Sequence, residues 1–176
     1  MKYSRTPLVA GNWKMNGDRA MARQLVASLV KNSTVNSEVE VVIFPPSLLV
    51  DTVFTAAHGA LAVGLQNISQ QAHGAFTGEL SVAMAKEAGC RWSLVGHSER
   101  RALCGETNTE VADKFAVLQA GGITPVLCLG ETLAQREAGE TQTVVAEQLA
   151  AVIAKVGVDV LARAVIAYEP VWAIGT

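Results

Sequence analysis

Four ionisable residues stand where an apolar run of this 176-residue sequence gives way to polar residues: Lys14, His97, Glu99 and Glu169. Carboxylate and imidazole groups transfer protons near neutral pH, and an ammonium group is a positive charge that stabilises anions. Each type also has a commoner use when it occurs alone. Glu169 before Pro170 could be a solvated carboxylate at a strand end. His97 could be a helix cap, and Lys14 an ordinary surface lysine. Whether these residues have a catalytic or a structural role therefore depends on the strands and helices that carry them.

Short apolar runs recur along the chain, and stretches with the spacing of an amphipathic helix separate them. The runs are Leu8–Ala10, Val39–Phe44, Leu61–Leu65, Trp92–Val95, Thr124–Leu129 and Ala164–Tyr168. Because half of the residues are hydrophobic and only 17% are charged, we expect strands that are buried on both faces. The alternation predicts parallel βαβ units, with six strands and five full helical crossovers.

Parallel strands end at the same edge of a sheet, so the polar residues that follow them gather there. In an α/β barrel this edge carries the active site. In an open doubly wound sheet the site lies at the same edge, where the strand order reverses. Periodicity does not choose between the two architectures. In both of them the four ionisable residues lie just past the carboxyl ends of parallel strands.

Composition and charge argue against several classes of protein. A length of 176 residues without a polar linker fits one domain. The net charge of -2 gives no general reason to bind nucleic acid or an anionic membrane. No apolar run approaches the ~20 residues of a membrane span, and we expect no secretory signal. The cysteines Cys90, Cys104 and Cys128 are widely spaced, which favours reduced thiols in a cytoplasmic protein.

Three motifs together resemble the triosephosphate isomerase family. They are AGNWKMN at residues 10–16, GHSERR at 96–101 and AYEPVWAIGT at 167–176, which match the family's first strand, fourth loop, and sixth strand with its lid. Segments around Gln66 and Gly78 match in the same order. The resemblance implies a parallel (β/α)8 TIM barrel, of which residues 1–176 form a single partial domain. It also implies an enzyme of glycolysis, gluconeogenesis and the pentose phosphate pathway. That enzyme interconverts dihydroxyacetone phosphate and D-glyceraldehyde 3-phosphate by proton transfer through an enediolate.

The resemblance also assigns roles to the main candidate residues. Glu169 becomes the base that moves a proton between adjacent carbons, since its two oxygens can receive and return a proton without a large movement. His97 becomes the electrophile that donates a hydrogen bond to the substrate carbonyl and then to the enediolate. Lys14 becomes the positive charge that faces the dianionic substrate.

Supporting roles follow for other residues. Asn12 resembles a substrate contact, and its alternative is an Asx turn. Glu99 takes a supporting or proton-shuttling role, or else pairs with an arginine of the same motif. Cys128 is interpreted as a buried thiol and Glu106 as a structural carboxylate.

Two segments resemble mobile or protruding parts of the family. The lid comprises Pro170, Val171 and Trp172 as its first hinge and Ala173, Ile174, Gly175 and Thr176 beyond it. Gly175 would offer its backbone N–H to the substrate phosphate. The residues Thr77, Gly78 and Glu79 match a loop that reaches into the partner subunit of a homodimer. Their alternative is a mobile surface loop.

The family's barrel has eight βα units, whereas this sequence stops within the lid, before units seven and eight. We expect a fragment of a longer isomerase, inactive alone and prone to aggregate, because a six-stranded arc leaves two open edges. Two alternatives stay open: another cofactor-free sugar-phosphate enzyme, such as an aldolase or epimerase, and a non-catalytic fragment that self-associates. None of the six apolar runs contains the lysine that a Schiff-base aldolase needs. The motifs contain no metal-ligand cluster and no nucleotide-binding glycine pattern, so we expect no metal and no cofactor.

Overall fold

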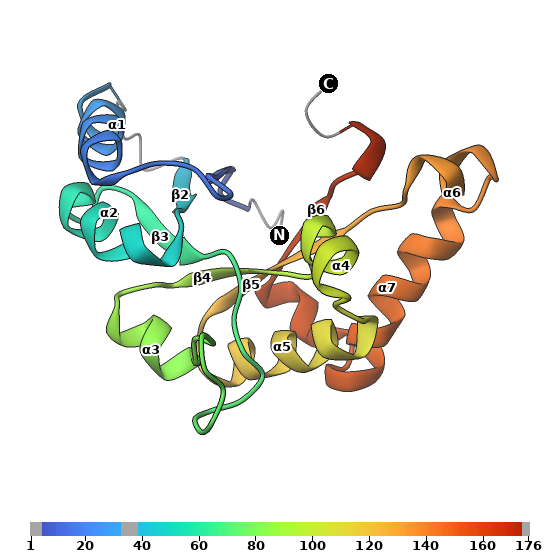
Figure 1. Cartoon of the computed structure of the whole chain (residues 1–176). Coiled ribbons are helices and arrows are strands. Elements are labelled where there is room, and N and C mark those ends of the chain that lie inside the picture. Colours follow the sequence, from blue (N-terminus) through green and yellow to red (C-terminus); the bar gives the residue numbers. More distant parts are fainter. Residues whose placement is uncertain (1–4, 33–38, 174–176) are drawn as a thin grey trace. The chain divides into compact units, whose positions relative to one another are not determined.

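The computed structural model describes residues 5–32 and 39–173 (Figure 1). The chain divides into two compact units. Unit 1 comprises Met1–Gln66 and Ala83–Ser93, and unit 2 comprises Asn67–Val82 and Leu94–Thr176. The expectation of a single domain over residues 1–176 stays a prediction.

Unit 1 consists of strands that alternate with helices. Its elements are β1 (Leu8–Asn12), α1 (Arg19–Asn32), β2 (Glu40–Phe44), the 3-10 turn η1 (Ser47–Leu49), α2 (Val50–Ala57), β3 (Ala62–Leu65), most of α3 (Val82–Glu87) and the first half of β4 (Trp92–Val95). Each strand pairs in parallel with the next one along the chain, for example through Val42 opposite Ala62 and Gly64 opposite Trp92. A doubly wound sheet would reverse its strand order within this stretch. The unbroken order β1-β2-β3-β4 is instead that of a TIM barrel, which confirms the predicted fold class.

Unit 2 continues the alternation with longer helices. After the second half of β4 come α4 (Ser98–Cys104), α5 (Asn108–Ala120), β5 (Thr124–Leu129), α6 (Leu133–Glu137), α7 (Thr141–Val156), the 3-10 turn η2 (Asp159–Arg163), β6 (Val165–Tyr168) and the 3-10 turn η3 (Val171–Ala173). Strand β6 lies parallel to β5, with Leu129 opposite Tyr168. Helices α5 and α7 pack against each other (Figure 1). Six strands thus occur where the apolar runs predicted them, and helical segments connect each strand to the next.

Helix starts in unit 2 follow from local sequence. Thr107 precedes α5, and its hydroxyl accepts a hydrogen bond from the backbone N–H of Glu110, whose carboxylate in turn accepts from the N–H of Thr107. This reciprocal capping satisfies two backbone donors that the first turn of a helix leaves unpaired. Thr132 and Gln135 form the same arrangement at the start of α6. Local sequence therefore fixes the residue at which each of these two helices begins.

The strand core is buried, but not uniformly. Every residue of β3 is buried, and at Gly64 a side chain would collide with the ring of Phe44, since an added Cβ would lie 2.4 Å from Cε1. The prediction of two-sided burial is wrong for β1 and β6, where Val9 is 58% exposed and Ile166 is 45% exposed. Among the described residues each of these two strands has a single strand neighbour, so one edge and part of a face stay uncovered.

Candidate active site

The end of β6 places Glu169 beside the end of β5. Its backbone N–H donates to the carbonyl of Leu129 at 2.8 Å, which extends the parallel ladder by one residue. Pro170 follows and favours extended backbone at Glu169. The side chain is 39% exposed, yet its Oε2 is buried and accepts no hydrogen bond from the described residues. Glu169 thus presents a carboxylate oxygen that lacks a donor.

His97 caps the N-terminus of α4 with its side chain. The ring is buried, and its Nδ1 accepts a hydrogen bond from the backbone N–H of Glu99 at 3.2 Å. A nitrogen that accepts a hydrogen bond carries no proton, so the ring proton of the neutral imidazole is assigned to Nε2. That nitrogen lies 3.4 Å from Oε2 of Glu169. The cap therefore directs the N–H of His97 toward the same space as the Glu169 carboxylate.

The geometry of this pair suits a proton transfer next to a polarised oxygen. A separation of 3.4 Å exceeds the ~2.7–3.2 Å of a usual N–H···O bond, so the two groups are close without being tightly bonded. A carbonyl oxygen could accept from Nε2 of His97 while the adjacent carbon lies beside the Glu169 carboxylate. A base and a hydrogen-bond donor would then act on neighbouring atoms.

Cys128 lies near this pair but does not share its chemistry. The thiol is buried within β5, and burial, with a further contribution from the negative charge of Glu169, raises its pKa to about 12. Since the thiolate is the nucleophilic form, a thiol that stays protonated at neutral pH is unreactive. The residue packs as a small apolar group, in keeping with the interpretation as a buried thiol.

Glu131 anchors the segment that follows the base. Its carboxylate is fully buried and accepts hydrogen bonds from the Tyr168 hydroxyl and from the indole N–H of Trp172, both at 3.0 Å. The guanidinium of Arg136 lies 4.2 Å from the centre of the Trp172 ring. The Trp172 hydrogen bond is the main cause that holds the pKa of Glu131 below its ordinary value. A hinge of the predicted lid is thus tied to the loop after β5.

The lid is described only as far as Ala173, whereas the loop that contains Thr77, Gly78 and Glu79 is described throughout. Val171 to Ala173 form the turn η3, whose first N–H donates to the carbonyl of Glu131 at 3.0 Å. Ile174, Gly175 and Thr176 lie outside the described residues. In the loop, Thr77, Gly78 and Glu79 are exposed, and a backbone hydrogen bond of 2.9 Å from Ser69 to Leu80 closes its base.

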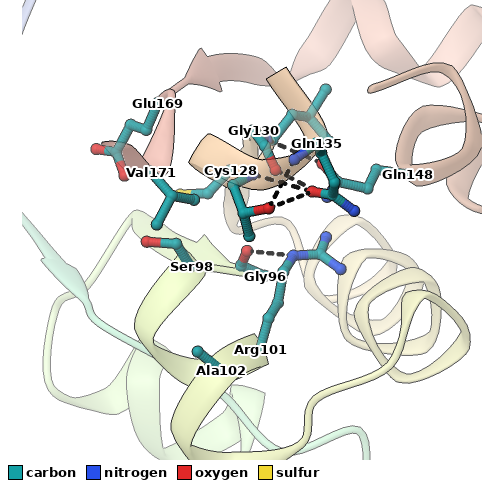
Figure 2. Close-up of a pocket in the computed structure, with 12 residues that line it drawn as sticks. Gly96, Ser98, Arg101, Ala102, Cys128, Gly130, Gln135, Gln148, Glu169 and Val171 are labelled. Atoms are coloured by element: carbon teal, nitrogen blue, oxygen red, sulfur yellow. Dashed lines mark hydrogen bonds between the residues drawn. The ribbon is translucent and has the colours of Figure 1, made fainter. Parts of the chain in front are cut away.

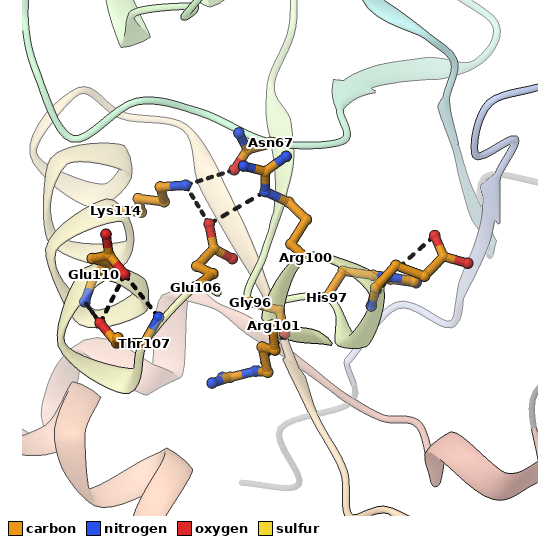
Figure 3. A network of polar contacts seen from close by, with 10 residues as sticks. Asn67, Gly96, His97, Arg100, Arg101, Glu106, Thr107, Glu110 and Lys114 are labelled. Atoms are coloured by element: carbon orange, nitrogen blue, oxygen red, sulfur yellow. Dashed lines mark hydrogen bonds and ion pairs between the residues drawn. The ribbon is translucent and has the colours of Figure 1, made fainter. Parts of the chain in front are cut away.

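The two arginines of the 96–101 motif are engaged with other groups. Arg100 donates to Glu106 at 3.3 Å, and the buried Glu106 also contacts Lys114, whose ammonium group donates to Asn67 (Figure 3). Arg101 donates to the carbonyl of Gly96 at 2.7 Å. Glu99 places Oε2 3.7 Å from Nδ1 of His97.

Unit 1 holds Lys14 and Asn12. Asn12 accepts a hydrogen bond from the backbone N–H of Lys14 at 3.0 Å, so the alternative Asx turn is present. Lys14 itself has a φ of 52°, a left-handed conformation that is uncommon outside glycine. Gln66 stabilises it, because its Nε2 donates to the Lys14 carbonyl at 2.9 Å and to the Phe44 carbonyl at 2.8 Å. Strained backbone that neighbouring groups hold in place is frequent at functional sites.

The sequence predicted that Lys14, His97, Glu99 and Glu169 lie at one edge of the sheet. Unit 2 places the last three in one neighbourhood, whereas Lys14 belongs to unit 1. Sequence reasoning assigned no role to Gln66, which directly follows β3, or to Glu131, the second residue after β5. Their position after a strand was the only available signal, since their partners lie up to 52 residues away. Across the described residues, no three His, Cys, Asp or Glu side chains are grouped as metal ligands. No helix in the described part of the chain is long and apolar enough to cross a membrane.

Comparison with known proteins finds one family. The family model for triosephosphate isomerase matches residues 7–176. A triosephosphate isomerase of Alcanivorax borkumensis is 51% identical over 173 residues, which cover 98% of this chain and 69% of the relative. Triosephosphate isomerases of Pseudomonas entomophila and Dechloromonas aromatica are each 53% identical with the same coverage.

Proposed function

Since this chain belongs to the triosephosphate isomerase family, we propose that Glu169 and His97 are the base and the electrophile of its isomerase reaction. The observation that carries the proposal is the 3.4 Å approach of Nε2 of His97 to the unpartnered Oε2 of Glu169. The substrates are dihydroxyacetone phosphate and D-glyceraldehyde 3-phosphate.

The reaction proceeds by two proton transfers between carbon and Glu169. The carboxylate removes a proton from the carbon beside the carbonyl, and the electrons of the C–H bond form the carbon–carbon double bond of an enediolate. The N–H at Nε2 of His97 stabilises the negative charge that develops on the carbonyl oxygen. A proton passes from the hydroxyl oxygen on the first carbon to the former carbonyl oxygen, and Glu169 returns its proton to the adjacent carbon, so that a hydroxyl group and a carbonyl group are exchanged between the two carbons. Nothing is oxidised or reduced overall, so no cofactor takes part.

Lys14, Asn12 and Glu99 support this chemistry in the proposal. The Lys14 ammonium group attracts the dianionic substrate, and its backbone geometry is stabilised by Gln66 and by the Asx turn of Asn12. The turn uses Oδ1 of Asn12 and leaves its amide nitrogen for a substrate oxygen. Glu99 lies beside the His97 ring and acts as a supporting carboxylate.

The lid segment, which follows Glu169, excludes water from the site when it closes. Trp172 and Tyr168 both bind Glu131, so the segment after Glu169 has a defined resting attachment. Closure requires that part of this attachment be released. Gly175 then offers its N–H to the phosphate. Water exclusion strengthens the hydrogen bond to the enediolate and favours its protonation over loss of phosphate.

The proposed assembly is a cytoplasmic homodimer. The exposure of Thr77, Gly78 and Glu79 supports it, since these residues lie in the loop of unit 2 that the family resemblance matches to a contact with the partner subunit. The free thiols Cys90, Cys104 and Cys128 fit a reducing compartment.

The test is an isomerisation assay on two proteins. The first is the 176-residue chain with its mass verified. The second is a fusion in which Thr176 is followed by the part of the Alcanivorax borkumensis relative that lies beyond the match. We expect interconversion of the two triose phosphates by the fusion and loss of at least a hundredfold in kcat for its His97→Gln variant, roughly the effect of removing one oxyanion donor. The expectation that the shorter chain alone is inactive stays a prediction. Equal turnover by the His97→Gln variant would remove the imidazole from the mechanism.

A further inference from the structure

Gly130, which follows β5, lies so close to the backbone of Glu169 that only glycine, which has no Cβ atom, fits at this position. A Cβ atom added at Gly130 would lie 1.9 Å from the Glu169 carbonyl oxygen and 2.8 Å from its carbonyl carbon. Both neighbours are backbone atoms, which cannot rotate away as a side chain does. The position of Gly130 therefore limits where the backbone of Glu169 can lie.

Gln148, in the middle of α7, holds Gly130 at both of its polar backbone groups. The Gly130 N–H donates to Oε1 of Gln148 at 2.9 Å, and Nε2 of Gln148 donates to the Gly130 carbonyl at 3.1 Å (Figure 2). Two bonds from one planar carboxamide fix both the distance and the orientation of the loop. Because Gln148 is buried, loss of either bond would leave a polar group unsatisfied, so the arrangement resists displacement.

These contacts form a short chain from an outer helix to the base. Gln148 fixes Gly130, Gly130 borders the Glu169 carbonyl, and the Glu169 N–H is bonded to Leu129 directly before Gly130. The buried oxygen Oε2 of the Glu169 carboxylate accepts no hydrogen bond from the described residues that would hold it otherwise. Its place is thus set through its own backbone. An error of 1 Å in such a placement costs on the order of a hundredfold in rate.

We propose that Gln148 is a positioning residue that sets the place of Glu169 relative to His97 through Gly130. The inference rests on the proposed function for its effect on turnover. Its structural part concerns the backbone of Glu169 alone. Gln148 touches neither the substrate nor the reacting atoms.

The experiment compares Gln148→Met with Gln119→Met. Methionine keeps the length of the side chain and removes both hydrogen bonds. Gln119 on α5 is a matched control, since its Nε2 donates to the carbonyls of Val160 and Arg163, which precede β6 and lie away from the base. Three properties are measured for each variant and for the unmodified protein: the urea midpoint, kcat and KM for triose phosphate in the fusion that extends the chain beyond Thr176, and the carboxyl ¹³C chemical shift of Glu169 at one fixed pH by NMR. That signal is assigned by its disappearance in Glu169→Gln.

We expect both variants to lower the urea midpoint to a similar degree. Gln148→Met alone lowers kcat by roughly tenfold to a hundredfold with KM within about twofold, and it alone changes the carboxyl chemical shift of Glu169. The proposal is overturned if the two variants behave alike in kcat and in the carboxyl chemical shift of Glu169. If the unmodified fusion neither binds nor converts triose phosphate, the proposed function fails, and the carboxyl chemical shifts of the two variants still decide the role of Gln148.

Discussion

Nε2 of His97 lies 3.4 Å from Oε2 of Glu169, while Nδ1 of the same ring accepts the backbone N–H of Glu99. The two ring nitrogens of His97 therefore have different hydrogen-bonding roles. The nitrogen toward the helix is an acceptor, and the nitrogen toward the base is a donor.

This assignment predicts the tautomer of His97 in solution. With ¹⁵N-labelled imidazole at neutral pH, we expect the ring to be protonated at Nε2 and unprotonated at Nδ1, because the Glu99 N–H occupies the lone pair of Nδ1. His58 and His73 in the same sample are the internal comparison, since no such cap is seen at either. A spectrum in which the proton of His97 resides on Nδ1 would contradict the cap geometry.

Alkylation should distinguish the three cysteines. Burial raises the pKa of Cys90 to about 11 and that of Cys128 to about 12, whereas Cys104 is exposed. Iodoacetamide at pH 8 should therefore label Cys104 and leave the other two unmodified in the folded chain, since it reacts with thiolate. Peptide mass spectrometry measures the labelled fraction. All three should react once the chain is unfolded in urea, and rapid labelling of Cys128 before unfolding would refute its burial.

Acid should weaken the anchor of the lid, which consists of the hydrogen bonds from Trp172 and Tyr168 to the Glu131 carboxylate. Hydrogen bonds to the carboxylate, chiefly from Trp172, hold the pKa of Glu131 below its ordinary value of about 4.3. The anchor therefore contributes its full stabilisation above that ordinary value and loses it as the pH falls through the lower, folded value. We expect Trp172 fluorescence to change in this acid range, with Trp13 and Trp92 each replaced by Phe. The Glu131→Gln variant should already show part of the change at neutral pH. A Trp172 signal that is insensitive to both would rule out the anchor.

Gln66→Leu should destabilise unit 1. The substitution removes both donors to the carbonyls of Lys14 and Phe44, and it leaves the left-handed backbone of Lys14 without this support. The Phe44 carbonyl keeps the hydrogen bond from the Trp13 N–H, so the loss falls mainly on the Lys14 carbonyl. An acceptor left unpaired costs about 1–3 kcal/mol when it is buried, so we expect a fall in the free energy of unfolding, measured with urea. Gln71→Leu on the exposed loop is the comparison and should change little. Equal stability of both variants would show that Gln66 does not hold Lys14.

Local sequence predicted some contacts and not others. The apolar runs predicted each strand because continuous apolar segments between turns are typical of buried parallel strands. The Asx turn of Asn12 was foreseeable, since its donor is only two residues away. Periodicity alone did not separate the barrel from a doubly wound sheet. The family resemblance implied the barrel, and the order of the paired strands confirmed it.

The groups that hold the site could not be predicted in this way. Gln66 reaches Lys14 across 52 residues, Trp172 reaches Glu131 across 41, and Gln148 reaches Gly130 across 18. Such pairs depend on how strands and helices pack in three dimensions, and a glutamine within a helix has no local feature that marks it. The resemblance to a family identified the reacting residues, whereas their supports required the structure.

The most direct test of the account is the Glu169→Asp variant in the triose phosphate assay, made in the fusion that extends the chain beyond Thr176. Removing one methylene withdraws the carboxylate from the substrate carbon by about 1 Å and keeps its charge. We predict that kcat falls by roughly a hundredfold or more, while KM stays within about threefold of the unmodified fusion. An unchanged kcat would show that Glu169 is not the base.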